Sequence, residues 1–163
     1  MIACFDVDYR EKHGHIGGVL IRKWTDDKAF INYNLVVGDI AEYVPGQFYK
    51  RELPCILKLM DTIVEPIDLI IVDGYVWLTP EKMGLGAYLY EALDETIPIV
   101  GVAKNYFKDT EAVQVLRGES KKPLYVTAAG ISAEWAAQQV EKMAGEYRFP
   151  SILKEVDHLC RAW

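Results

Sequence analysis

The sequence predicts a mixed α/β fold, in which one sheet is antiparallel at first and parallel later and carries helices on both faces. β-branched and aromatic residues dominate residues 1–37. Continuous apolar runs then alternate with segments whose apolar residues recur every three or four positions. Such an order is typical of a mixed sheet covered by helices. No repeat or linker divides the 163 residues, so we expect a single domain over residues 1–163.

The first third of the chain predicts three antiparallel strands joined by hairpins. They are expected at residues 2–8, 17–24 and 28–37, where Val, Ile, Phe and Tyr are frequent. The segment between the last two strands contains two aspartates and is a turn signal. His13 and His15 lie in the first connection. We expect them in an exposed turn rather than at a metal, because no third ligand is near in sequence.

A loop with proline and glycine precedes the first expected helix. Residues 41–50 contain the run Tyr43-Val-Pro-Gly46, which prevents a helix or a central strand from continuing. Residues 51–64 then carry apolar side chains at spacings of three and four, which predicts one face of a helix. Pro54 stands in its first turn, where the missing N–H costs little.

The remaining elements follow from apolar runs and helix signals. Residues 68–72 and 97–103 are apolar without polar alternation, which is typical of strands covered on both faces. Ser132 is a good N-cap for a helix. Helices are expected at residues 80–93, 132–143 and 151–160, and a hairpin at residues 111–116 and 124–127.

Composition limits the classes of function. The formal charge is −6, which disfavours a nonspecific nucleic-acid coat protein but not an enzyme with a local basic rim. Cys4, Cys55 and Cys160 are too widely spaced for a CxxC site and odd in number, which excludes a fully paired disulfide framework. The N-terminal segment has Asp6 where a signal peptide needs apolar residues, and no window offers a membrane-spanning run. We therefore expect a cytoplasmic protein that does not enter a membrane.

Three acidic residues stand where acids are costly. Asp6 interrupts the first strand, Asp73 ends an apolar run, and Glu52 opens a helix after the Pro-Gly loop. If the two strands are neighbours, Asp6 and Asp73 meet at one edge of the sheet, and crowded carboxylates repel unless a cation lies between them. Oxygen ligands suit Mg²⁺ or Mn²⁺ rather than zinc. Taken singly, each acid also fits a local role at a turn or a helix N-terminus.

Five stretches around these acids carry a family resemblance. They are Phe5-Asp-Val-Asp-Tyr9, Tyr43-Val-Pro-Gly-Gln-Phe-Tyr-Lys-Arg-Glu-Leu-Pro54, Asp68-Leu-Ile-Ile-Val-Asp-Gly74, Ile97-Pro-Ile-Val-Gly-Val-Ala-Lys104, and Pro123-Leu-Tyr-Val126 followed by Gly130-Ile-Ser132. In this order, along almost the whole chain, they resemble endonuclease V, a family with a ribonuclease H-like fold. The stretch from Tyr43 to Pro54 is the most specific.

The resemblance implies an activity and its residues. Family members are hydrolases that cut a phosphodiester bond 3′ to deoxyinosine in DNA, a repair reaction, or to inosine in RNA. Their metal-binding and catalytic carboxylates match Asp6, Glu52 and Asp73, which implies Mg²⁺, with Mn²⁺ as a second choice. The residues expected to contact nucleic acid are Tyr43, Pro45 and Gly46 in a strand-separating wedge, Lys50 and Arg51 beside it, Gly74, and Lys104.

The sequence also departs from the family. A family histidine that contributes to the active site usually precedes Ile-Ser, where this chain has Ala128-Ala-Gly130, and Tyr75 replaces the histidine of Asp-Gly-His. Asp157 or His158 on the last expected helix is a candidate to replace the lost group. Two alternatives stay open: an inosine-binding module that cuts weakly or not at all, and an unrelated metal-dependent phosphatase. We expect a monomer whose partner is inosine-containing DNA or RNA.

Overall fold

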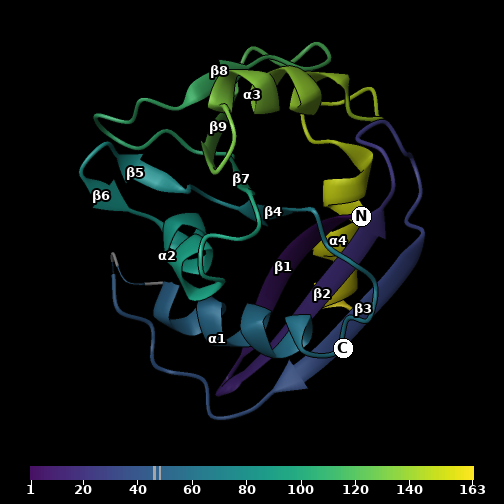
Figure 1. The fold of residues 1–163 in the computed structure, drawn as a ribbon, viewed down its shortest axis with the longest axis vertical. Helices are drawn as coiled ribbons and strands as arrows, with labels where there is room; N and C mark the ends of the chain where they lie inside the picture. The colour runs from purple at the N-terminus through teal and green to yellow at the C-terminus, as the bar shows by residue number, and fades with distance from the viewer. Residues whose placement is uncertain (46, 48) are drawn as a thin grey trace.

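A seven-stranded mixed sheet forms the centre of the structure, a computed structural model that describes residues 1–45, 47 and 49–163. In spatial order the strands are β3 (Ile31–Val37), β2 (His13–Ile21), β1 (Ile2–Arg10), β4 (Leu69–Asp73), β7 (Ile99–Ala103), β9 (Leu124–Ala129) and β8 (Val113–Val115). The first three are antiparallel, and β1, β4 and β7 are parallel (Figure 1). The predicted mixed sheet is confirmed, although β9 and β8 return to antiparallel pairing.

In the described residues, four helices cover the two faces of this sheet. They are α1 (Tyr49–Met60), α2 (Leu85–Ala92), α3 (Ala133–Lys142) and α4 (Ser151–Arg161). Alternate residues of β1 explain the layering, because successive side chains of a strand point to opposite faces. Ala3 and Phe5 pack with α1 and α2, whereas Ile2 and Cys4 pack with α3 and α4.

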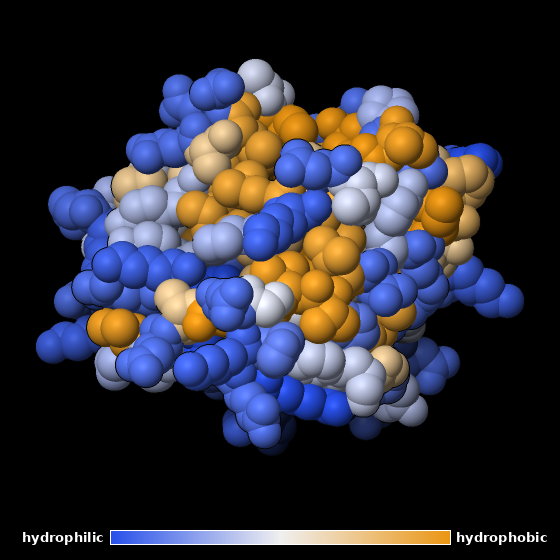
Figure 2. Space-filling view, turned by 90° about the horizontal axis from the view of Figure 1, so that it is seen from below, coloured by the Kyte–Doolittle hydropathy of each residue, from blue (hydrophilic) through white to orange (hydrophobic). Residues whose placement is uncertain are grey.

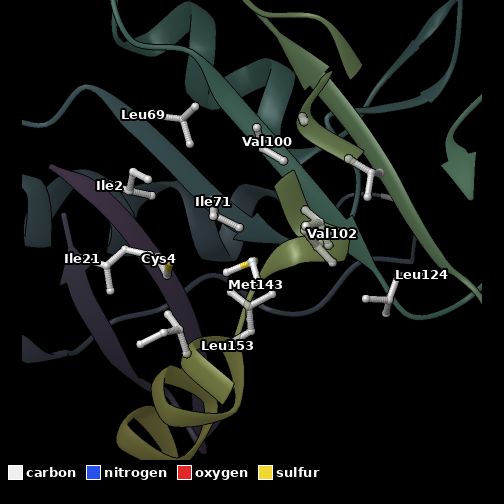
Figure 3. Packing of buried hydrophobic residues seen from close by; sticks show 14 of the residues in the cluster. Ile2, Cys4, Ile21, Leu69, Ile71, Val100, Val102, Leu124, Met143 and Leu153 are labelled. Carbon is white, nitrogen blue, oxygen red and sulfur yellow. The ribbon is translucent and has the colours of Figure 1, made fainter. Parts of the chain in front are cut away.

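The core cluster that contains Ile2 and Cys4 fixes the position of α4. Figure 3 shows Cys4 of β1, Ile71 of β4 and Val102 of β7 on the same side of the sheet, with Leu153 of α4 and Met143 facing them. All five residues are at least nine-tenths buried. Burial of several such side chains stabilises the helix against the sheet, at roughly 1.5–3 kcal/mol for each large one. The carboxyl half of α4 lies beside the second half of β1 and the first half of β2, where Arg10 bonds to Arg161 and His15 meets Cys160.

Two regions differ from the prediction. The helix expected at residues 80–93 begins only at Leu85, and a short hairpin of β5 (Trp77–Thr79) and β6 (Lys82–Met83) precedes it. A Cβ on Gly84 would lie 2.4 Å from the carbonyl oxygen of Tyr75, so the tight return of the chain requires glycine here. The second strand starts earlier than expected, at His13, and it contains His15, which is buried rather than in an exposed turn.

The face that carries α1 is partly apolar at its surface. Viewed from that side, hydrophobic residues form a band between hydrophilic ones (Figure 2). Leu53 and Leu57 of α1 are only partly buried, and Val64 just beyond the helix is 86% exposed. None of the helices in the described part of the chain has the length and apolarity needed to cross a bilayer.

Candidate functional site

Asp6, in the middle of β1, and Asp73, at the end of β4, lie side by side just beyond the last paired residues of these parallel strands. Phe5 pairs with Val72 in the parallel register, so the next residues of the two strands are Asp6 and Asp73. Both carboxylates belong to the face that α4 covers, because they alternate with residues of the opposite core. Gly74 follows with a φ of 89°, a conformation that glycine adopts without strain, and turns the chain away at the sheet edge.

Glu52 approaches the same edge from the other side of the sheet. It stands in the first turn of α1, where a carboxylate is favoured by the helix dipole. Burial, followed by the negative charges of Asp73 and Asp6, raises the pKa of Glu52 to about 8. The positive charge of the neighbouring Arg51 opposes this shift. The three acids predicted from the sequence are therefore close enough to interact, although they come from separate elements.

A fourth carboxylate reaches Asp6 from α4. One oxygen of Asp6, one oxygen of Asp157 and the Sγ of Cys160 all lie within 4.8 Å of one another. Burial, followed by the charges of Asp73 and Asp157, raises the pKa of Asp6 to about 7. Desolvation alone would raise the pKa of Asp157, but its hydrogen bond and ion pair with Arg161, at 2.9 Å, lower it overall. The pKa of Asp6 is thus raised and that of Asp157 is lowered, so Asp6 is the more easily protonated of the two neighbours.

Asp73 is the most accessible of these acids. Its side chain is exposed at the strand end, yet the surrounding protein still raises its pKa by desolvation, and the charge of Lys104 opposes this shift. Lys104 follows β7, and its Nζ lies 4.3 Å from the centre of the Phe149 ring. The lysine predicted to contact a phosphate therefore stands beside the acidic edge.

The chemistry of this donor set fits a divalent cation. Asp6, Glu52, Asp73 and Asp157 supply oxygen ligands from four different elements, and three of the four have raised pKa values because burial and mutual repulsion disfavour their charged forms. A hard cation such as Mg²⁺ or Mn²⁺ would remove this repulsion. Carboxylates arranged only for structure would instead be paired with basic side chains. Of these four acids, only Asp157 has a salt-bridge partner among the described residues.

The loop that precedes α1 presents an aromatic side chain next to the acids. Tyr43 is 61% exposed, and Val44 and Pro45 are exposed as well. The guanidinium carbon of Arg51 lies 3.8 Å from the centre of the Tyr9 ring and 5.7 Å from that of Tyr43. Arg51 therefore links the loop to the sheet through its contact with Tyr9.

The remaining predicted contact residues are distributed around this edge. Lys50 is exposed at the start of α1, and Gly74 follows Asp73 directly. Gly46 lies outside the described residues. Of the two candidates on the last helix, Asp157 reaches the acids, whereas His158 is exposed. Sequence reasoning missed Cys160, although its position three residues after Asp157 places it on the same helix face.

Comparisons with known proteins identify the family. The sequence profile of endonuclease V matches residues 1–117. Endonuclease V of Streptomyces avermitilis is 29% identical over 147 residues, which are 77% of this chain and 63% of the relative. Endonuclease V of Sulfurisphaera tokodaii is 36% identical over 101 residues, 61% of this chain and 47% of the relative. The chain thus spans under two thirds of the length of these relatives.

Solved structures show the same fold. The Streptomyces avermitilis endonuclease V structure has a TM-score of 0.79 at 24% identity, covering 98% of this chain and 79% of that one. A Ciona intestinalis endonuclease V, solved in complex with DNA that contains an inosine followed by a ribo-adenosine, has a TM-score of 0.81 at 17% identity over 98% of this chain and 84% of that one. The fold is therefore ribonuclease H-like, and this chain belongs to the endonuclease V family.

Proposed function

We propose that this chain is a divalent-metal-dependent endonuclease that cuts a phosphodiester bond 3′ to deoxyinosine or inosine. The observation that carries the proposal is the convergence of four carboxylates where β4 ends beside the middle of β1, near an exposed aromatic loop. Membership of the endonuclease V family supports it. The relative from Ciona intestinalis, whose structure contains inosine-bearing DNA, supports nucleic acid as the partner.

The carboxylates would hold Mg²⁺ or Mn²⁺. Asp6 and Asp73 are the direct ligands in this proposal, Asp157 is the third group beside them, and Glu52 holds the ion or orients the attacking water. A metal in such a site polarises a phosphoryl oxygen and lowers the pKa of water. Glu52 can accept a proton from water because burial already raises its pKa to about 8, near neutral pH.

The residues around the acids would position the strand. Lys104 stands beside Asp73 and offers a cation for a phosphate next to the scissile one. Tyr43 and Pro45 would enter the space that a displaced nucleotide leaves, with Arg51 holding Tyr43 in place. An inosine pairs more weakly than adenine, so its removal from the stack costs less free energy, and a wedge of this kind selects for it.

A cleavage assay tests the proposal. Oligonucleotides with one inosine, as DNA and as RNA, are incubated with Mg²⁺, with Mn²⁺ or with a chelator, beside matched oligonucleotides with adenine at the same position. We expect cleavage 3′ to inosine only with metal, leaving 3′-hydroxyl and 5′-phosphate ends. Asp73→Asn should lower the rate by at least about 100-fold, since it removes a charged group that acts in the reaction.

The matched control is Asp68→Asn at the other end of the same strand segment. Asp68 is exposed and pairs only with the N-terminal amine, so the control should cut at the wild-type rate. Retained binding to the inosine oligonucleotide without any cleavage would replace the enzyme by a binding module. Turnover of small phosphoesters without preference for an oligonucleotide would support a phosphatase instead.

A further inference from the structure

Cys160 places a sulfur atom at the edge of the carboxylate cluster. Its Sγ and one oxygen each from Asp6 and Asp157 lie within 4.8 Å of one another, and the residue is 1% exposed. Asp157 and Cys160 are three residues apart on α4, so both side chains project from the same face of the helix. That face rests on β1 and β2, and the sulfur lies near Asp6 in the middle of β1.

The thiol is available as a ligand. Its S–H donates to the backbone carbonyl of Asp157 at 3.2 Å, a contact within the helix that leaves the sulfur lone pairs unused. Binding of a thiophilic ion would displace the thiol proton, as metal binding to cysteine requires a thiolate.

We infer that this site also takes a thiophilic divalent cation, of the Zn²⁺ or Cd²⁺ class, with Cys160, Asp6 and Asp157 as ligands. Zinc–sulfur and zinc–oxygen bonds of about 2.3 and 2.0–2.2 Å place two ligand atoms at most about 4.5 Å apart across one ion. The ligand atoms of Asp6, Asp157 and Cys160 lie within 4.8 Å of one another, which is close to this distance. Small side-chain rotations would bring all three to one ion.

The consequence is competition between two kinds of metal. Asp6 belongs both to the oxygen-ligand site of the proposed nuclease and to the sulfur-containing site, so a thiophilic ion excludes Mg²⁺ from Asp6. In binding, one M²⁺ takes the thiolate of Cys160 and the carboxylates of Asp6 and Asp157, and the thiol proton passes to solvent together with any proton that a carboxyl group holds. This inference rests on the proposed function only for the competition, and not for the binding itself.

The ultraviolet thiolate-to-cadmium charge-transfer absorption tests the binding directly. Cd²⁺ is added to the reduced protein, and the absorption is followed together with Cd²⁺ and Mn²⁺ affinities from calorimetry. We expect the wild-type protein to develop the absorption at one equivalent of Cd²⁺ and Cys160→Ser to lose it. The substitution should weaken Cd²⁺ binding by at least about 10- to 100-fold, and Mn²⁺ binding far less, because Mn²⁺ prefers oxygen.

Cys4 and Cys55 provide matched controls. Both are fully buried cysteines, so Cys4→Ser and Cys55→Ser subject the core to the same change. Each should retain the absorption, and circular dichroism should show that all three variants fold. An absorption that survives in Cys160→Ser, or none in the folded wild-type protein, would overturn the inference.

A cleavage assay separates this inference from the proposed function. If the protein cuts inosine oligonucleotides with Mg²⁺, added Cd²⁺ should inhibit the wild-type protein, and excess Mg²⁺ should reverse the inhibition. If the cadmium absorption appears in a protein that never cuts, the metal inference stands and the nuclease proposal fails. If the protein cuts but no absorption appears, only the metal inference fails.

Discussion

Asp6 shows how one residue acquires its chemistry from distant parts of the chain. Its side chain is partly buried. This burial and the charges of Asp73 and Asp157 raise its pKa to about 7. Asp157 is held ionised by Arg161. The sequence indicated Asp6 and Asp73 because one interrupts an apolar strand and the other ends one. It offered Asp157 only as one of two candidates, since Asp157 is 151 positions further along the chain than Asp6.

The carboxylates predict how the stability of the metal-free protein changes with pH. Glu52 has an ordinary value of 4.5 and a folded pKa of about 8, so between these values the folded state keeps a proton that the unfolded state has lost. The free energy of unfolding should therefore fall as pH rises from about 4.5 to about 8, and stay level above that range. Asp6, whose pKa is about 7, acts in the same direction.

Glu52→Gln tests this dependence. Glutamine cannot ionise, so it should flatten the decline and make the metal-free protein more stable at pH 8, by an amount on the order of 2 kcal/mol once solvent screening is allowed for. Urea denaturation at several pH values with a chelator measures it. Glu81→Gln, an exposed change on the β5–β6 hairpin, is the control and should follow the wild-type curve. A Glu52→Gln curve that declines as steeply as the wild type would contradict the assignment.

At the scale of elements, the sequence predicted those with a strong periodic signal. The apolar runs of β4 and β7 and the helix that Ser132 caps were recognisable because their patterns are local. The β5–β6 hairpin was not, since strands of three and two residues carry too little pattern and its tight return depends on the contact of Gly84 with Tyr75. His15 was misplaced for a similar reason. Its ring is buried because Nδ1 meets the carbonyl of Cys160, which is 145 residues away.

This histidine belongs to a set of contacts that hold the end of α4. His15 Nδ1 lies 2.7 Å from the carbonyl oxygen of Cys160. Arg10 donates to the carbonyl oxygens of Trp163 and Arg161 at 2.7 and 2.9 Å. The indole N–H of Trp163 donates to Asp8 at 2.9 Å. Because the same helix carries Asp157, these contacts fix the position of a carboxylate at the site.

Arg10→Ala should therefore loosen the end of α4. Loss of two hydrogen bonds to helix carbonyls should lower the free energy of unfolding by about 1–2 kcal/mol. It should also weaken Mn²⁺ binding by up to about tenfold, since displacing a supporting group around a metal site has effects of this size. Urea denaturation and calorimetry measure the two quantities. Arg22→Ala is a matched control, because Arg10 lies over the ring of Trp163 and Arg22 lies over that of Phe30, away from α4. Unchanged Mn²⁺ affinity in Arg10→Ala would refute a positioning role for Arg10.

The charge of the whole molecule limits how the proposed binding of nucleic acid can occur. Its formal charge is −6, so no broad basic surface attracts a phosphate backbone. Lys50, Arg51 and Lys104 nevertheless lie around the carboxylates, where a bound cation would add further positive charge. Binding should thus depend on a few local contacts together with the wedge loop, and not on the net charge.

The salt dependence of binding measures how many such contacts form. In a chelator, which prevents cleavage, the logarithm of the affinity for an inosine oligonucleotide should fall linearly with the logarithm of the salt concentration. Three phosphate contacts predict a slope of about −2 to −3, because each contributes about −0.7 on a single strand and about −0.9 on a duplex. Lys104→Ala should reduce the magnitude of the slope by about one contact. Lys142→Ala changes an exposed lysine at the end of α3, and should leave the slope unchanged. Fluorescence anisotropy gives the affinities. An equal loss of slope in both variants would show that the oligonucleotide is bound by charges spread over the surface rather than by basic residues beside the carboxylates.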